Sequence, residues 1–158
     1  MEAWHDFFVA VAGAAAALTG LIFVGVSLSL SKIITTKLPD RASEALILLM
    51  TALIISCLCL APQSSTLLGI EILVLGVLVW FFMLRLDLSV LRATDKEYRK
   101  HYQRMIVLTQ LATLSYIISG IVTLVCGCGG IYWLIPAIVV SFGKSVLDAW
   151  VILVEIHR

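Results

Sequence analysis

Several side chains capable of acid–base or ion chemistry stand inside long apolar runs of this sequence. Lys144 and Asp148 are four residues apart, the spacing at which oppositely charged side chains on one helix meet and pair. Because a charge in hydrocarbon costs about 2.5–3.5 kcal/mol on insertion scales, such residues form either a paired structural network or an ion or proton site. In the second interpretation, Asp148 is the acceptor and Lys144 is the group that tunes it.

Other polar side chains are expected at the same depth in the membrane. A rise of 1.5 Å per residue places Lys144 roughly 20 Å and Asp148 roughly 26 Å along a helix that begins at Ile131. We therefore predict one inner polar cluster, which contains Arg85, Asp87, Gln110, Lys144 and Asp148. In the structural interpretation, Lys144 neutralises Asp148 and Arg85 neutralises Asp87.

Glu71 stands near the opposite, outer end of its apolar run, about one helical turn or roughly 6 Å deep. Its expected partners are His5 and the N-terminal backbone. Two interpretations stay open, an outer cation-entry or proton-binding group and a carboxylate that simply reaches headgroups or water.

The cysteines form two C-x-C pairs, Cys57/Cys59 and Cys126/Cys128, both towards the predicted outer face. That pattern suggests thiol redox or metal chemistry. However, residues i and i+2 of a helix point about 200° apart, and C-x-C lacks the thioredoxin-like C-x-x-C spacing. Buried thiols are favoured, and a disulfide from Cys59 to Cys126 or Cys128 remains an alternative.

The sequence contains no zinc-protease, nucleophile-elbow or phosphate-loop motif and no metal-spaced histidine set. We therefore expect no enzyme activity, no cofactor and no metal. The chain of 158 residues is 61% hydrophobic and 13% charged, with a mean hydropathy of +1.09. Soluble proteins average about 45–50% apolar and 25% charged residues, so the composition predicts a polytopic membrane protein. The net charge of +1 predicts no nucleic-acid partner.

The elements that would position these residues are five transmembrane helices in one all-α domain, residues 1–158. Uncharged runs and turn signals place them at about 7–31, 45–61, 67–90, 105–125 and 131–154. The turns between the second and third and between the fourth and fifth spans are PQSST, 62–66, and CGCGG, 126–130.

Lysines and arginines occur in the first and third connectors and are absent from the other two. The positive-inside rule therefore predicts an outside N-terminus and a cytoplasmic C-terminus.

The runs GAAAALTGLIFVGVSLSLSKI, LPDRASEALILL and LVEIHR resemble an uncharacterised family of small multi-pass bacterial membrane proteins. The resemblance covers most of the chain and implies a location in the bacterial inner membrane. It carries no catalytic or ligand-binding residues over to this sequence.

Small and hydroxylated residues recur at helical spacing along the first, second, fourth and fifth spans. Those of the first and fourth spans are Ala10, Gly13, Ala17, Gly20, Ser27 and Ser31, and Thr109, Thr113, Gly120 and Thr123. Such stripes either pack helices closely or line a water-accessible path, which in a five-helix protein would form between protomers.

The leading functional hypothesis is a homo-oligomeric ion or small-solute channel in the lipid bilayer. The alternatives are a non-enzymatic regulatory protein that binds another membrane protein through the same faces, and a thiol redox protein of the outer face.

Overall fold

The computed structural model describes residues 4–28, 38–93 and 99–156. These residues form five long α-helices and no strand: α1 (His5–Leu28), α3 (Leu38–Leu60), α4 (Ser65–Ala93), α5 (Arg99–Cys126) and α6 (Ile131–Ile156). A short 3₁₀ helix, η2 (Gly127–Gly130), joins α5 to α6. All five α-helices are long and apolar enough to cross a membrane, so the predicted all-α bundle of five spans is confirmed.

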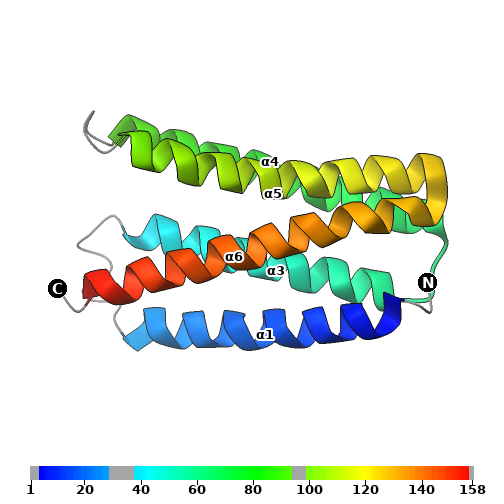
Figure 1. The fold of residues 1–158 in the computed structure, drawn as a ribbon, viewed down its shortest axis with the longest axis horizontal. Helices are drawn as coiled ribbons and strands as arrows, with labels where there is room; N and C mark the ends of the chain where they lie inside the picture. Colours follow the sequence, from blue (N-terminus) through cyan, green and yellow to red (C-terminus); the bar gives the residue numbers. More distant parts are fainter. Residues whose placement is uncertain (1–3, 29–37, 94–98, 157–158) are drawn as a thin grey trace.

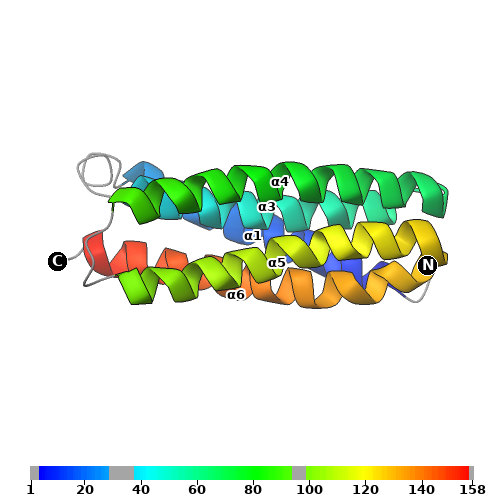
Figure 2. The same ribbon diagram turned by 90° about the horizontal axis from the view of Figure 1, so that it is seen from above.

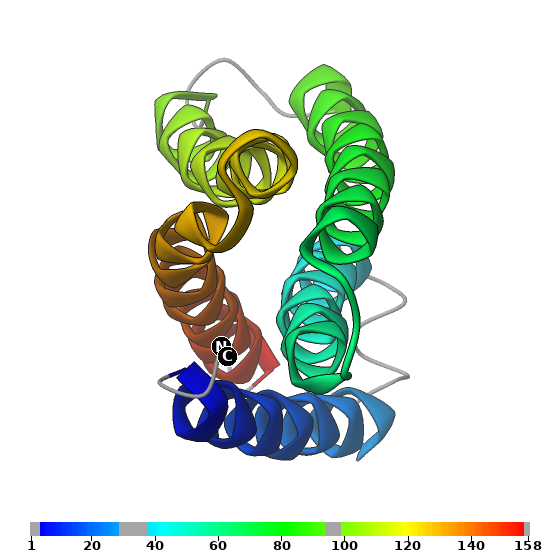
Figure 3. The same cartoon turned by 90° about the vertical axis from the view of Figure 1, so that its right-hand side faces the viewer.

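The helices lie in three layers (Figure 1). Helices α4 and α5 pair on one side, α3 and α6 lie in the middle, and α1 covers the other side, where it packs mainly on α3. The end view shows α1 crossing the neighbouring layer at an angle (Figure 3). Figure 2 shows that α5 and α6 run side by side, and the two helices are in extensive contact. Helix α1 begins and α6 ends at opposite ends of the bundle (Figure 1).

Both predicted turns form, although the first is shorter than the predicted 62–66 because α4 begins at Ser65. After α3 ends, the Ser64 hydroxyl accepts a hydrogen bond from the backbone N–H of Leu67 at 3.3 Å and thereby caps α4. Gly127 has a φ of 64°, a left-handed conformation that glycine adopts without a Cβ clash. Ser119 of α5 donates a hydrogen bond to the carbonyl of Gly130 at 2.8 Å, which fastens this turn to the bundle.

Glycines allow α4 and α5 to approach each other closely. A Cβ atom added to Gly120 would lie 2.7 Å from the backbone nitrogen of Leu73, and one added to Gly76 would lie 3.2 Å from that of Ile117. In lipid, close backbone approach supplies much of the attraction between helices because burial from water is not available. The pair α4 and α5 is therefore a tightly packed unit that holds its polar side chains in fixed positions.

Candidate functional site: a buried charge network

Lys144 of α6 lies between two carboxylates inside the bundle. Its Nζ atom is 2.8 Å from Oε2 of Glu44 on α3, and it also donates a hydrogen bond to Oδ2 of Asp148. The side chains of Lys144, Glu44 and Asp148 are only 1%, 9% and 1% exposed. The Lys144–Asp148 pair predicted from the four-residue spacing is thus confirmed. We call these three residues the Lys144 triad.

Helix periodicity brings the triad together. Ser141, Lys144, Ser145 and Asp148 recur at intervals of three and four residues, so they share one buried face of α6. The Ser145 hydroxyl donates a hydrogen bond to the carbonyl of Ala45 at 3.1 Å, next to Glu44. A salt bridge and a neighbouring hydrogen bond therefore join α6 to α3 at the same level.

Asp87 forms a second polar chain beside the triad. Gln110 of α5 donates a hydrogen bond to Oδ2 of Asp87 on α4 at 2.9 Å. Trp80 lies two helical turns before Asp87 on α4 and donates its indole N–H to Oε1 of Gln110, also at 2.9 Å. Because both the oxygen and the nitrogen of the Gln110 amide are hydrogen-bonded, this side chain fixes the position of Asp87, which is only 3% exposed.

The Lys144 triad and Asp87 interact electrostatically. Asp87 interacts with the charges of Glu44, Lys144 and Asp148. Arg41 of α3 also interacts with Asp148. We call Arg41, Asp87 and the Lys144 triad the inner network. With every member ionised, its two cations and three carboxylates leave one net negative charge inside the bundle.

Arg85 does not belong to this network, contrary to the sequence-based expectation. Its side chain is exposed on α4, and its guanidinium carbon lies 4.6 Å from the centroid of the Phe81 ring. Among the described residues, no ion pair joins Arg85 to Asp87. The reason is geometric, because residues i and i+2 point about 200° apart on a helix.

Glu44 is the site residue that sequence reasoning missed. The predicted second span began at residue 45 because its boundaries followed uncharged runs, whereas α3 begins at Leu38. A usable signal was present: Glu44 precedes Leu48, Thr51 and Ile55 by four, seven and eleven residues, and all are buried on the same face. A charge on the apolar face of a membrane helix indicates a partner within the bundle.

The small-residue stripe of α1 faces away from the rest of the chain. Its described members, Ala10, Gly13, Ala17, Gly20 and Ser27, are all exposed, and Ser31 lies outside the described residues. A Cβ atom added to Gly13 or Gly20 would meet nothing within 4 Å. The buried contacts of α1 come from other positions, such as Phe8 and Ala15. Among the helices that the structure describes, none covers this stripe.

The stripe of α5 has the opposite environment. Thr109, Thr113, Gly120 and Thr123 are all buried. The hydroxyls of Thr113 and Thr123 donate hydrogen bonds to backbone carbonyls of their own helix at 2.9 and 2.7 Å. Here the small residues pack helices of the same chain, so they do not line a path between protomers.

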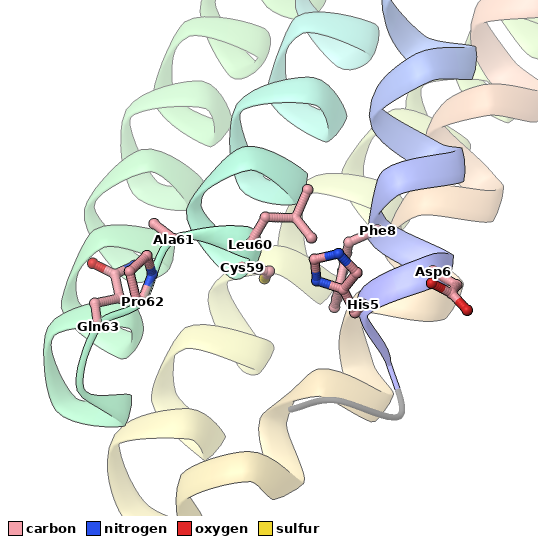
Figure 4. A pocket seen from close by; sticks show the side chains of 8 residues that line it. All are labelled: His5, Asp6, Phe8, Cys59, Leu60, Ala61, Pro62 and Gln63. Atoms are coloured by element: carbon pink, nitrogen blue, oxygen red, sulfur yellow. The ribbon is translucent and has the colours of Figure 1, made fainter.

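Glu71 pairs with a different residue from the one expected. Gln63 donates its amide to Oε2 of Glu71 at 2.9 Å and to the carbonyl of Leu58 at 3.0 Å. His5 instead lines a cavity of about 480 Å³, together with Asp6, Cys59 and Gln63 (Figure 4). No group of three or more potential metal ligands occurs among the residues that the structure describes.

The described cysteines are not paired. Cys57 and Cys126 are exposed free thiols, and Cys59 is a free thiol buried in the core. The side chain of Cys128 lies outside the described residues. As the helical geometry predicts, Cys57 and Cys59 do not share one environment.

The described residues define an all-α protein with five helices suited to crossing a membrane and a charged network between three of them, α3, α4 and α6. Comparisons with protein-family models, characterised proteins and solved structures find no match to this chain.

Proposed function

We propose that this integral membrane protein transports an ion or small solute, with the inner network as its ion-responsive site. The observation that carries the proposal is Lys144, buried between Glu44 and Asp148 within a segment long and apolar enough to span a membrane. Intramembrane charges are costly and are typical of ion and proton pathways. Stability alone is a weak reason to keep them, because apolar residues of similar volume often stabilise a protein as well as a buried ion pair does.

The proposed working form is a homo-oligomer that associates through the face of α1 that points away from the bundle. Only 22% of the α1 span is buried within the chain, compared with 50% for residues 41–60 of α3. Its exposed small residues would let α1 of a second copy approach closely, as small-residue faces do between membrane helices.

Flux through liposomes tests the transport function. Purified protein is reconstituted and assayed with H⁺, Na⁺, K⁺ and Cl⁻ gradients. We expect flux of at least one ion, and a changed flux in Asp148→Asn. The matched control is Arg85→Gln, which removes an exposed charge of α4 and should leave the flux unchanged. Absence of flux for the whole panel would overturn the proposal.

Crosslinking of Gly13→Cys in a background without the native cysteines tests the assembly. A crosslinked dimer of this chain supports the homo-oligomer, and the exposure of Gly13 makes the position suitable. A crosslink to a different membrane protein in cells would instead favour the second candidate function, that of a regulatory protein. Gly143→Cys, exposed on α6, is the control position.

The proposed setting is the bacterial inner membrane, with the N-terminus outside and the C-terminus in the cytoplasm. The supports are the basic residues in the first and third connectors and the resemblance described above. Labelling of intact cells with an impermeant maleimide should modify Ser64→Cys and spare Gln103→Cys. The reverse labelling pattern would mean that the protein has the opposite orientation.

The redox hypothesis receives no support from the free thiols of Cys57, Cys59 and Cys126.

A further inference from the structure

Buried hydroxyl groups continue from the inner network along the interface of α5 and α6. The hydroxyls of Tyr116 on α5 and Ser141 on α6 are 3.0 Å apart, and both side chains are fully buried. Either oxygen can be the donor of this hydrogen bond. Ser119, one turn further along α5, hydrogen-bonds the carbonyl of Gly130 at the turn. Polar side chains thus extend from the η2 end of the bundle to the triad.

The hydroxyl pair leads towards Lys144 on the same face of α6. Ser141 precedes Lys144 by three residues, and Lys144 precedes Asp148 by four, so the three side chains follow one another along the helix. At 1.5 Å per residue, Ser141 and Asp148 are about 10 Å apart along the axis. The sequence spacing places Lys144 between them, but Ser141 is hydrogen-bonded to Tyr116, and Lys144 to Glu44 and Asp148. A proton that passes from Ser141 to Lys144 therefore needs a water molecule between the two side chains.

The charge balance of the inner network favours a cation. Lys144 is paired with Glu44 from α3 and Asp148 from its own helix, and it interacts electrostatically with Asp87 from α4. Arg41 from α3 interacts with Asp148, and α5 contributes the uncharged Gln110. The network carries one net negative charge when all of its members are ionised. Uptake of one positive charge therefore makes it neutral, while an anion would add to the unbalanced charge.

The geometry further distinguishes a proton from a metal cation. The ammonium group of Lys144 already lies between the two carboxylates of the triad. Among the described residues no three acidic, histidine or cysteine side chains converge on a metal position. A hard cation needs six or more oxygen ligands, or several retained waters, whereas a proton needs only one acceptor oxygen.

We propose that the transported ion is the proton and that it moves inside each protomer, from Tyr116 and Ser141 through Lys144 to Asp148. This proposal rests on the transport function proposed above and places the route within the chain rather than between protomers.

The transfer conserves protons and changes no oxidation state. Each hydroxyl accepts one proton and gives up its own. Lys144 passes a proton from Nζ to Oδ2 of Asp148, which becomes a neutral carboxylic acid, and is reprotonated from the Ser141 side. Asp148 is 1% exposed, so it releases its proton only when the bundle opens and water reaches its carboxyl group from the Ile156 end of α6, and it is then again a carboxylate. One proton enters and one leaves.

Proton flux into liposomes that contain a pH-sensitive dye tests the route, with a K⁺ diffusion potential as the driving force. Tyr116→Phe keeps the ring and removes only the hydroxyl, and Ser141→Ala removes its partner. We expect both to lower proton flux by about 100-fold, the scale on which a positioned proton-transfer group contributes. Ser141→Thr keeps the hydroxyl and should retain flux.

The matched control is Ser115→Ala. Ser115 also has a buried hydroxyl on α5, but this hydroxyl donates a hydrogen bond to the carbonyl of Leu111 in its own helix. It is not part of the proposed proton route. Size-exclusion chromatography and circular dichroism verify that each variant is folded. Flux should be unchanged in this control.

Each outcome is decisive for one of the two proposals. Flux of Na⁺ or K⁺ without protons would overturn the proton assignment and keep the transport function. Proton flux that persists in both Tyr116→Phe and Ser141→Ala, or that falls equally in Ser115→Ala, would overturn the route. No flux of any ion in the wild type would overturn the transport function itself.

Discussion

Replacing Lys144 with methionine removes the cation that neutralises two buried carboxylates while keeping a side chain of similar length. The inner network would change from two cations and three carboxylates to one cation and three carboxylates. Breaking a buried ion pair by removing one partner costs about 3–5 kcal/mol. For a chain of this size, 1 kcal/mol shifts the unfolding midpoint by about 2–4 °C, so Tm should fall by about 6–20 °C.

The triple variant Glu44→Met, Lys144→Met, Asp148→Leu separates charge imbalance from loss of packing. It leaves Arg41 and Asp87, one charge of each sign, and fills the space of the triad with apolar side chains. Replacement of a whole buried ion cluster is often neutral or stabilising, so the triple variant should recover most of the lost Tm. Removing all three charges therefore costs less than removing one.

The assay is thermal unfolding in a mild detergent, followed by the fluorescence of the four tryptophans. Arg85→Met is the control, because this cation is exposed and stacks on Phe81, a contact that contributes about 0.5–1 kcal/mol. Equal unfolding temperatures of Lys144→Met and Arg85→Met would contradict a stabilising role for the Lys144 charge. A triple variant no more stable than Lys144→Met would contradict charge imbalance as the cause.

Three further predictions follow from the packing. Gly120→Ala should lower the free energy of unfolding by about 1–3 kcal/mol because its Cβ would lie 2.7 Å from the backbone of Leu73. Gly20→Ala has open space around it and should change the free energy of unfolding by less than about 1 kcal/mol. Denaturant titration in detergent compares the two variants. Gln110→Leu should cost about 1–3 kcal/mol by the same titration because it removes the hydrogen bonds to both Asp87 and Trp80, and equal stability with wild type would contradict this role. A membrane-permeant maleimide should modify Cys57 and Cys126 faster than Cys59, as mass spectrometry of timed samples would show; equal rates would contradict the burial of Cys59.

The sequence predicted the number and approximate position of the helices because each span needs a long apolar run, and such runs are visible without a structure. The Lys144–Asp148 pair was also predictable, since it depends only on local helix geometry. Glu44 was not found, because the rule that ends a span at the first charge discards a charge that is paired across the bundle. Its partner is a hundred residues away, and only the packing of α3 against α6 brings the two together.

Other expectations failed for reasons already contained in helix geometry. Arg85 and Asp87 are two residues apart, so they cannot share a face, and the argument that separates Cys57 from Cys59 applies equally to them. The orientation of the small-residue stripes is a different case. Gly13 and Gly120 occur in similar patterns, but a Cβ at the first would meet nothing and a Cβ at the second would meet the backbone of Leu73. A stripe therefore identifies a face without identifying its partner.

The position of α1 separates assembly from ion chemistry. Helices α3, α4 and α6 supply the inner network, and α5 supplies Gln110, which hydrogen-bonds Asp87. Helix α1, which packs mainly on α3, supplies none of these residues. Gly20 lies on the face of α1 that points away from the bundle, where a Cβ atom would meet nothing within 4 Å. Gly20→Leu should therefore leave the inner network intact. If the route lies inside the protomer, this variant changes association while each chain keeps its proton flux. If the route lies between protomers, association and flux change together.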